Sequence, residues 1–168
     1  MADLTKEQHI ENIKKVIEGV KYAMMTTITA DEKHLHACPM TTNKNELENG
    51  KIWFIGDRKS ETIKDLEKNP QVNLSYTSSD QKDFVSINGT AKLVNDKAKL
   101  DELWSPIYAA FYEKGKEDPN VQVICIECNG AQYWLSGNTV VDMFKMVSAA
   151  VQEGKTAENM GENHAVTF

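Results

Sequence analysis

The sequence predicts a mainly β protein with flanking helices (α+β), in which an antiparallel sheet closes or half-closes into a barrel. Roughly seven segments alternate apolar and polar residues in the manner of strands. Most of the connections between them have hairpin length, which favours antiparallel neighbours. Helical periodicity is confined to the N-terminus and a few short segments. No repeat or linker divides the chain, so we expect one domain over residues 1–168.

The first helix begins at a capping box formed by Thr5 and Gln8. Apolar residues follow at helical spacing, and they predict an amphipathic helix of about four turns. These residues are Ile10, Ile13, Ile17 and Val20. Strands are then expected over residues 22–29 and 35–42, with a turn at 30–33. The Asn49-Gly50 pair predicts a hairpin that leads into a strand over residues 51–55.

A short helix is predicted over residues 61–68, with Ser60 as its N-cap and Asn69-Pro70 at its end. Strands over residues 72–76 and 85–93 come next. A helical stretch from about 96 to 112, kinked near Pro106, precedes two strands over 121–127 and 132–135. A last helix carries apolar residues at helical spacing, and the tail over 155–168 is expected to be loosely held. The apolar residues of that helix are Val140, Phe144, Val147 and Val151.

Composition narrows the class of protein. The formal net charge is -6, which argues against a nucleic-acid surface because phosphates require clustered Lys and Arg. The chain has no apolar run long enough to span a membrane and no secretory apolar segment near its start. Three cysteines do not suggest a disulfide framework. We therefore expect a cytoplasmic protein with no nucleic-acid or membrane partner.

The strongest local signal lies at residues 54–62, where a strand ends and a helix begins. Exposed backbone N–H groups at a helix N-terminus suit a phosphate. Ser60 and Thr62 add hydroxyl donors, and Arg58, the one arginine of the chain, adds a charge together with Lys59. Gly56 allows a ligand to approach the backbone. The alternative is an ordinary capped helix with solvated basic residues, and the segment matches neither a P-loop nor GxGxxG.

Other motifs favour structural roles. Cys125 and Cys128 have CxxC spacing, but within a strand the two thiols would point to opposite faces. His34, His36 and Cys38 alternate along one strand and would need further ligands from elsewhere to hold zinc, so we expect no metal site. No GxSxG motif occurs. Several aromatic residues could wall a planar ring or serve as core residues: Trp53, Phe54, Tyr76, Phe84, Trp104, Tyr133 and Trp134.

Segments along nearly the whole chain resemble the pyridoxamine 5'-phosphate oxidase-like FMN-binding split barrels, in the general stress protein 26 branch. Their joint order and spacing carry the resemblance. They are 34–42 (HLHACPMTT), 53–57 (WFIGD) with Ser60, 69–76 (NPQVNLSY), 85–91 (VSINGTA), 102–104 (ELW), 115–119 (GKEDP), 132–134 (QYW) and 161–163 (GEN).

The resemblance implies a split-barrel homodimer with FMN, or FAD, at the subunit interface. It places the flavin against the strand at 38–42 and the turn at 54–62, with phosphate contacts around Ser60 and Thr62. It also implies a partner-strand contact at Phe84 and a tryptophan near the flavin at Trp134. The cofactor-binding residues expected on this basis are Cys38, Pro39, Met40, Thr41, Phe54, Ile55, Gly56, Asp57, Arg58, Ser60, Glu61, Thr62, Phe84 and Trp134.

Two positions depart from the pattern of the resembled family. Cys38 stands where relatives usually carry arginine, and Thr62 where lysine is common. Each difference removes a positive charge from the expected phosphate site, and one charge-assisted contact contributes about 1.5–3 kcal/mol. Arg58 and Lys59 flank the same turn and would compensate in part. The arginine-rich C-terminal motif of true pyridoxamine 5'-phosphate oxidases is missing after Trp134, which argues against that activity.

The resemblance thus implies an FMN-binding protein that acts as a flavin-dependent oxidoreductase on a small-molecule electron donor or acceptor, with a link to stress response. The alternative is a non-catalytic module that stores or senses flavin. The sequence names no proton donor, so the catalytic residues are unknown and turnover itself is undecided.

Overall fold

A computed structural model describes residues 4–42, 47–136 and 162–168 of the chain. Seven strands form one sheet in the order β2-β1-β4-β5-β6-β3, and β7 pairs with β6 beside that path. Every pairing is antiparallel, which confirms the predicted fold class. The strands are β1 (Tyr22–Ile28), β2 (Leu35–Thr41), β3 (Lys51–Asp57), β4 (Gln71–Thr77), β5 (Phe84–Val94), β6 (Val121–Leu135) and β7 (Glu162–Thr167).

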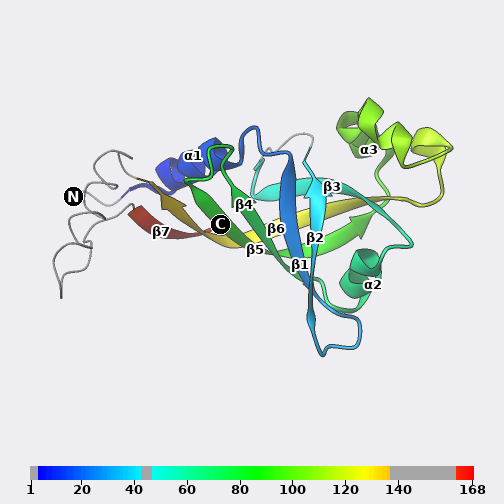
Figure 1. Cartoon of the computed structure of the whole chain (residues 1–168), viewed down its shortest axis with the longest axis horizontal. Coiled ribbons are helices and arrows are strands. Elements are labelled where there is room, and N and C mark those ends of the chain that lie inside the picture. Colours follow the sequence, from blue (N-terminus) through cyan, green and yellow to red (C-terminus); the bar gives the residue numbers. More distant parts are fainter. Residues whose placement is uncertain (1–3, 43–46, 137–161) are drawn as a thin grey trace.

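The helices cover the ends of the sheet. Figure 1 shows α1 (Lys6–Ile17) near β7, with α3 (Lys97–Leu103) at the opposite end of the molecule and α2 (Glu61–Lys68) beside the β1–β2 hairpin. The capping box is confirmed, since Gln8 N donates to Thr5 Oγ1 and Thr5 N donates to Gln8 Oε1. The first helix is shorter than expected because the chain turns at Gly19, which has a φ of +73°.

The two outer strands of the order, β2 and β3, curl toward one another. A Cβ built on Gly56 of β3 would lie 3.8 Å from Met40 Cε of β2. The sheet is therefore half closed, as the barrel interpretation requires. The Asn49-Gly50 hairpin is also confirmed, with φ values of 51° and 71° and backbone hydrogen bonds between Glu48 and Lys51.

The helix expected over residues 96–112 is not continuous, so that prediction was wrong. α3 ends at Leu103, and Trp104 and Ser105 take extended backbone conformations before Pro106. A proline disfavours the helical conformation of the residue that precedes it, so the chain breaks here where a kink was expected. Two 3₁₀ segments follow, η1 (Pro106–Ala110) and η2 (Gly115–Glu117).

The two strands predicted over 121–127 and 132–135 are one fifteen-residue strand, β6. Opposite Asn88 and Gly89 the register shifts, because Gly130 pairs with Asn88 and Cys128 pairs with Gly89. Asn129 is thus the extra residue of a β-bulge. A Cβ on Gly89 would lie 2.7 Å from the carbonyl oxygen of Glu127, so the bulge depends on glycine there. The break expected between two strands is a bulge within one strand.

The tail was expected to be loosely held, and for its last residues this was wrong. Glu162–Thr167 form β7, which pairs with residues 130–135 of β6. The helix predicted around Val140, Phe144, Val147 and Val151 lies outside the described residues. The two last predicted strands are thus one strand, β6, and the seventh strand of the sheet is β7.

The main core lies between the sheet, α1 and α2, and a smaller cluster packs near α3 and η1. Cys128 belongs to the main core together with Ile124 and Ile126 on the same side of β6. Cys125 lies between those two positions and is buried against the other face. Both thiols are free, so the prediction that the CxxC pair diverges is confirmed.

Candidate functional site

A cleft of about 360 Å³ opens where β2 and β3 meet the N-terminus of α2. β2 contributes one wall, and the end of β3 with the start of α2 contributes the floor. Tyr108, Phe111 and Tyr112 form the opposite wall, next to η1. A volume of this size is within the usual range for small-ligand sites.

The turn from β3 into α2 is held by Asp57 and Ser60. Asp57 accepts a hydrogen bond at Oδ1 from Lys59 N, 2.9 Å away, and its carbonyl oxygen accepts one from Ser60 N. Ser60 Oγ caps α2 by accepting from Ile63 N at 3.3 Å. The Ser60 O–H remains able to donate toward the cleft, as does the hydroxyl of the buried Thr62. The first N–H groups of the helix have no partner within the helix, so this end of the cleft offers donors to an anion.

Many of the residues predicted to bind a cofactor line this one cleft: Cys38, Pro39, Met40, Thr41, Ile55, Gly56, Asp57, Ser60 and Thr62. The others do not line it. Phe54 is buried in the main core, and the side chain of Glu61 pairs with Lys64 on the surface. Phe84 and Trp134 face each other across β5 and β6 and are about half exposed.

Arg58 was expected to bring positive charge to the cleft. Its Nη2 lies 3.5 Å from Oδ1 of Asn95, and its backbone N donates to the carbonyl oxygen of Asn120. The side chain therefore reaches toward the chain between β5 and α3 and does not line the cleft. Among the described residues, the lining contains hydroxyl groups and one carboxylate, that of Asp57, but no lysine or arginine.

Sequence reasoning missed the aromatic wall. Tyr108 and Tyr112 are buried, and Phe111 is 72% exposed at the rim of the cleft. Burial raises the pKa of both tyrosines to about 12, so their hydroxyls stay protonated near neutral pH. The spacing of the three rings was visible in the sequence, but nothing in it indicated that the segment after α3 folds back over the end of β3.

Hydrophobic side chains form the floor. A Cβ on Gly56 would lie 3.1 Å from Ile124 Cδ1 and 3.6 Å from Ile63 Cδ1. The absent side chain thus leaves the backbone of β3 open to the cleft. Ile63 and Ile124, which were not predicted, complete the apolar surface beneath it.

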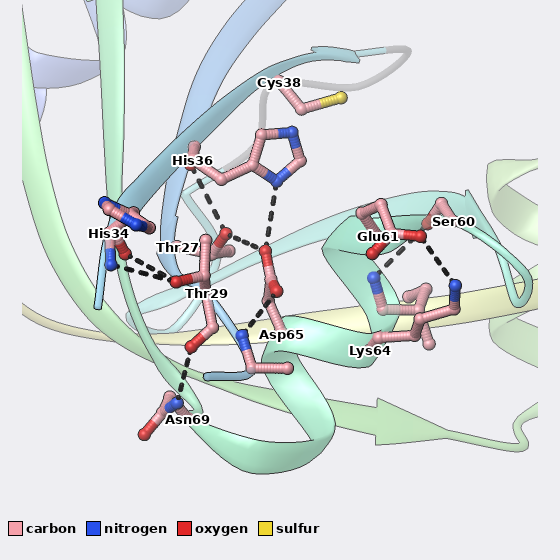
Figure 2. A network of polar contacts seen from close by, with 12 residues as sticks. Thr27, Thr29, His34, His36, Cys38, Ser60, Glu61, Lys64, Asp65 and Asn69 are labelled. Carbon is pink, nitrogen blue, oxygen red and sulfur yellow. Dashed lines mark hydrogen bonds and ion pairs between the residues drawn. The ribbon is translucent and has the colours of Figure 1, made fainter. Parts of the chain in front are cut away.

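Beside the cleft, Asp65 of α2 is the centre of a polar network (Figure 2). Its carboxylate is buried and accepts from Thr27 Oγ1 at 2.9 Å, from Ala30 N at 2.9 Å and from His36 Nδ1 at 3.1 Å. The network ties α2 to both strands of the β1–β2 hairpin. It also orients the His36 ring, which is partly exposed.

The three candidate zinc ligands do not gather. His34 precedes β2, and its backbone is hydrogen-bonded to Thr29. His36 is engaged by Asp65, and Cys38 lies farther along β2 at the cleft. Within the described ranges, no group of three or more His, Cys, Asp or Glu side chains converges as metal ligands would.

The fold defines a split-barrel protein, with a cleft at the N-terminus of a capped helix. The family model described as pyridoxamine 5'-phosphate oxidase like matches residues 8–157, and the chain belongs to this family. A curated relative, protein bli-3 of Neurospora crassa, is 26% identical over 159 residues, which cover 90% of this chain and 76% of that protein.

Solved structures agree with this assignment. A general stress protein 26 from a Jannaschia species superposes with a TM-score of 0.72 at 21% identity, covering 96% of this chain and 99% of that one, and shows the same fold. The general stress FMN/FAD binding protein of Xanthomonas citri is 31% identical with a TM-score of 0.66, over 78% of this chain and 90% of that one. These structures thus agree with membership of the pyridoxamine 5'-phosphate oxidase-like family.

The helices described in the structure include none that is long and apolar enough to cross a membrane.

Proposed function

We propose that this protein binds FMN in the cleft, with the phosphate at the N-terminus of α2. The observation that carries the proposal is the placement of Ser60, Thr62 and the free N–H groups of α2 at one end of a cleft whose remainder is apolar and aromatic. This arrangement matches a ligand with an anionic end and a planar ring. The name of the Xanthomonas citri neighbour, a general stress FMN/FAD binding protein, supports the same ligand class, and FAD is the alternative.

The residues of the cleft fit a flavin in their chemistry. The hydroxyls of Ser60 and Thr62 would donate to the phosphate. Met40, Ile55 and Ile124 offer apolar surface, and the tyrosine wall excludes water from the ring. When bound, the flavin supplies hydride or electron transfer, while the protein orients and desolvates it. On this basis we propose a flavin-dependent oxidoreductase that acts on a small-molecule electron donor or acceptor in the cytoplasm, within a stress response.

A second copy of the chain is part of the proposal. Tyr22, Phe84 and Trp134 are exposed aromatic residues on β1, β5 and β6. Phe84 pairs directly with Trp134, and Tyr22 and Phe84 line one shallow hollow. Neighbouring exposed aromatics of this kind are typical of interfaces. In a homodimer built on this face, Phe84 and Trp134 would contribute to the flavin site as the family resemblance implies.

A titration of the purified protein with FMN, followed by flavin fluorescence and visible absorption, tests the proposal. We expect saturation at one FMN per chain. The double variant Ser60→Ala, Thr62→Val removes two hydroxyl contacts of about 1 kcal/mol each and should weaken binding by roughly one decade or more. Lys33→Ala, on the exposed turn between β1 and β2 and away from both the cleft and the aromatic face, is the control and should bind as the wild type does. A protein whose spectrum and flavin fluorescence do not change with added FMN would overturn the proposal.

The non-catalytic alternative has one observation in its favour. Arg58 is directed to Asn95, and the described lining offers neutral donors to the phosphate, so the cleft is compatible with a reversible flavin store. Assays of the FMN-loaded protein with nicotinamide electron donors separate the two functions. Turnover that depends on FMN supports the oxidoreductase, whereas stoichiometric binding without turnover supports the storage or sensing module.

A further inference from the structure

Three polar side chains follow one another from the cleft toward the interior: Cys38, His36 and Asp65. Cys38 lines the cleft and is partly exposed. His36 lies two residues earlier on the same face of β2, because the burial of this strand alternates residue by residue. Asp65 contacts His36 from α2.

The hydrogen bonds of Asp65 indicate which ring nitrogen of His36 carries a hydrogen. Thr27 and Ala30 both donate to this carboxylate, which leaves it acting as an acceptor toward His36. His36 Nδ1 therefore carries a hydrogen and donates it to Asp65 Oδ2. In this tautomer the lone pair is on Nε2, which points away from Asp65 to the side where Cys38 lies (Figure 2).

His36 and Cys38 are neighbours on one face of β2. Residues two apart on a strand have Cα atoms about 6.6 Å apart with side chains on one face. Rotation of the Cys38 side chain about χ1 can direct Sγ toward the ring. In the structure, the Cys38 side chain packs beside the main core, and its Sγ donates a long hydrogen bond of 3.7 Å to the carbonyl oxygen of Pro39. An imidazole whose far nitrogen is fixed by a carboxylate is an arrangement that accepts a proton from a nearby thiol.

We propose that Cys38 is a reactive thiol, assisted by His36 and positioned by Asp65, which exchanges with small disulfides that enter the cleft. His36 Nε2 accepts the proton of the Cys38 thiol, and Sγ attacks one sulfur of the disulfide. The S–S bond of the reagent breaks, a new bond joins Sγ to one half, and the other half leaves as a thiol with the proton. No further oxidant or reductant is required. The reaction requires no flavin, and because Cys38 lines the cleft to which FMN is assigned, it is measured on the FMN-free protein.

The other two cysteines of the chain do not compete for this reaction. Burial raises the pKa of Cys125, and it raises that of Cys128 to about 12. Protonated, buried thiols are inert as nucleophiles. Both are buried on β6, and since all three cysteines lie in the described part of the chain, no exposed second thiol is present there to displace the adduct. The mixed disulfide on Cys38 should therefore persist until an external thiol removes it.

The test uses the purified full-length protein and oxidised glutathione, with the adduct followed by intact mass and located by peptide mapping. We expect one glutathionyl group per chain, on Cys38. The rate at which Cys38 forms the adduct should exceed that of N-acetylcysteine at the same pH by at least about tenfold. An optimally placed base contributes roughly 10²–10⁴-fold, so this threshold is a modest one. Dithiothreitol should restore the original mass.

Variants separate a chemical role of His36 from a structural one. His36→Gln should slow the reaction to within about twofold of N-acetylcysteine, whereas the matched control His34→Gln should react as the wild type. Asp65→Asn should also slow it, and the double variant should be no slower than His36→Gln alone because the two residues act as a unit. All rates are compared at a temperature where thermal unfolding shows each variant folded. A wild-type rate equal to that of N-acetylcysteine, an unchanged rate in His36→Gln, or an adduct on Cys125 or Cys128 would overturn the proposal.

Discussion

The phenolic oxygen of Tyr133 lies 2.7 Å from Nδ1 of His9, and through this contact the N-terminal helix is joined to the central strand β6. Asn12 donates to the same oxygen from the next turn of α1, at 3.3 Å. Because Asn12 is the donor here, the Tyr133 hydroxyl is free to donate to His9. Tyr133 is fully buried, so these hydrogen bonds fix α1, which the local sequence predicts, to the sheet.

Replacing Tyr133 by phenylalanine removes these hydrogen bonds and keeps the ring. We expect the free energy of unfolding to fall by about 1–2 kcal/mol, because two polar groups of α1 lose their partner at the edge of the core. Chemical denaturation followed by circular dichroism measures the change. Tyr22→Phe, on an exposed tyrosine, is the control and should have little effect. Equal stability of the Tyr133→Phe variant and the wild type would show that α1 is held by its apolar contacts alone.

Asp65 should be a larger determinant of stability than any surface ion pair. Asp65→Ala removes the acceptor of the Ala30 N–H. It also leaves the hydroxyl of Thr27, which is 1% exposed, with the longer contact of 3.3 Å to the carbonyl oxygen of His36. Loss of a buried charged acceptor with several donors costs about 3 kcal/mol. Asp101→Asn removes an exposed pair with Lys116 and should leave stability almost unchanged. Denaturant midpoints of the two variants give the comparison, and similar midpoints would contradict the prediction.

Stability should decline in alkaline solution because several buried groups are held in their protonated forms. The pKa of Cys128 is raised from 9.0 to about 12, and those of Tyr108 and Tyr112 from 10.0 to about 12, each by burial. The unfolded chain releases these protons at the lower, ordinary values. Their contribution is thus fully present below about pH 9 and is lost as the pH rises toward 12, at up to about 1.4 kcal/mol per pH unit for each group.

Urea denaturation at pH values from 7 to 10.5 measures this decline. Cys128→Ala removes one of the two buried thiols, Cys125 and Cys128, whose pKa is raised from 9.0 and which therefore titrate before the tyrosines in the unfolded chain. The stability of this variant should fall less steeply between about pH 9 and 10 than that of the wild type. Cys38→Ala, at the partly exposed thiol, is the control. Parallel curves for Cys128→Ala and the wild type would contradict the assignment to the buried thiol.

The proposed dimer predicts that a charge on the aromatic face separates the subunits. Phe84→Glu should convert the protein to a monomer in sedimentation velocity and weaken FMN binding, because a carboxylate cannot be desolvated in an apolar interface without a partner. Leu35→Glu, at an exposed apolar residue of the β1–β2 hairpin, should leave both properties unchanged. A wild-type monomer that binds FMN with full affinity would contradict the interface while leaving the cleft intact.

The sequence by itself determined the elements whose signals are local. The capping box at Thr5, the Asn49-Gly50 hairpin and the Ser60 cap each depend on residues within four positions of one another, and each is present in the structure. The β-rich alternation likewise predicted the antiparallel sheet. The family resemblance predicted that β2 and the turn before α2 share one site. The helix N-terminus independently indicated the same turn.

Tertiary structure decided the features that depend on contacts far apart in the chain. Residues 128–130 were expected to separate two strands, but pairing with β5 on one side and with β7 on the other keeps β6 extended through a bulge. The direction of Arg58 depends on Asn95, and the aromatic wall depends on how the chain returns after Pro106. The partners of His36 were equally unpredictable, because Asp65 lies 29 positions away on another element. Local propensity cannot encode such contacts, since their energies arise only once the strands are paired and the helices are packed.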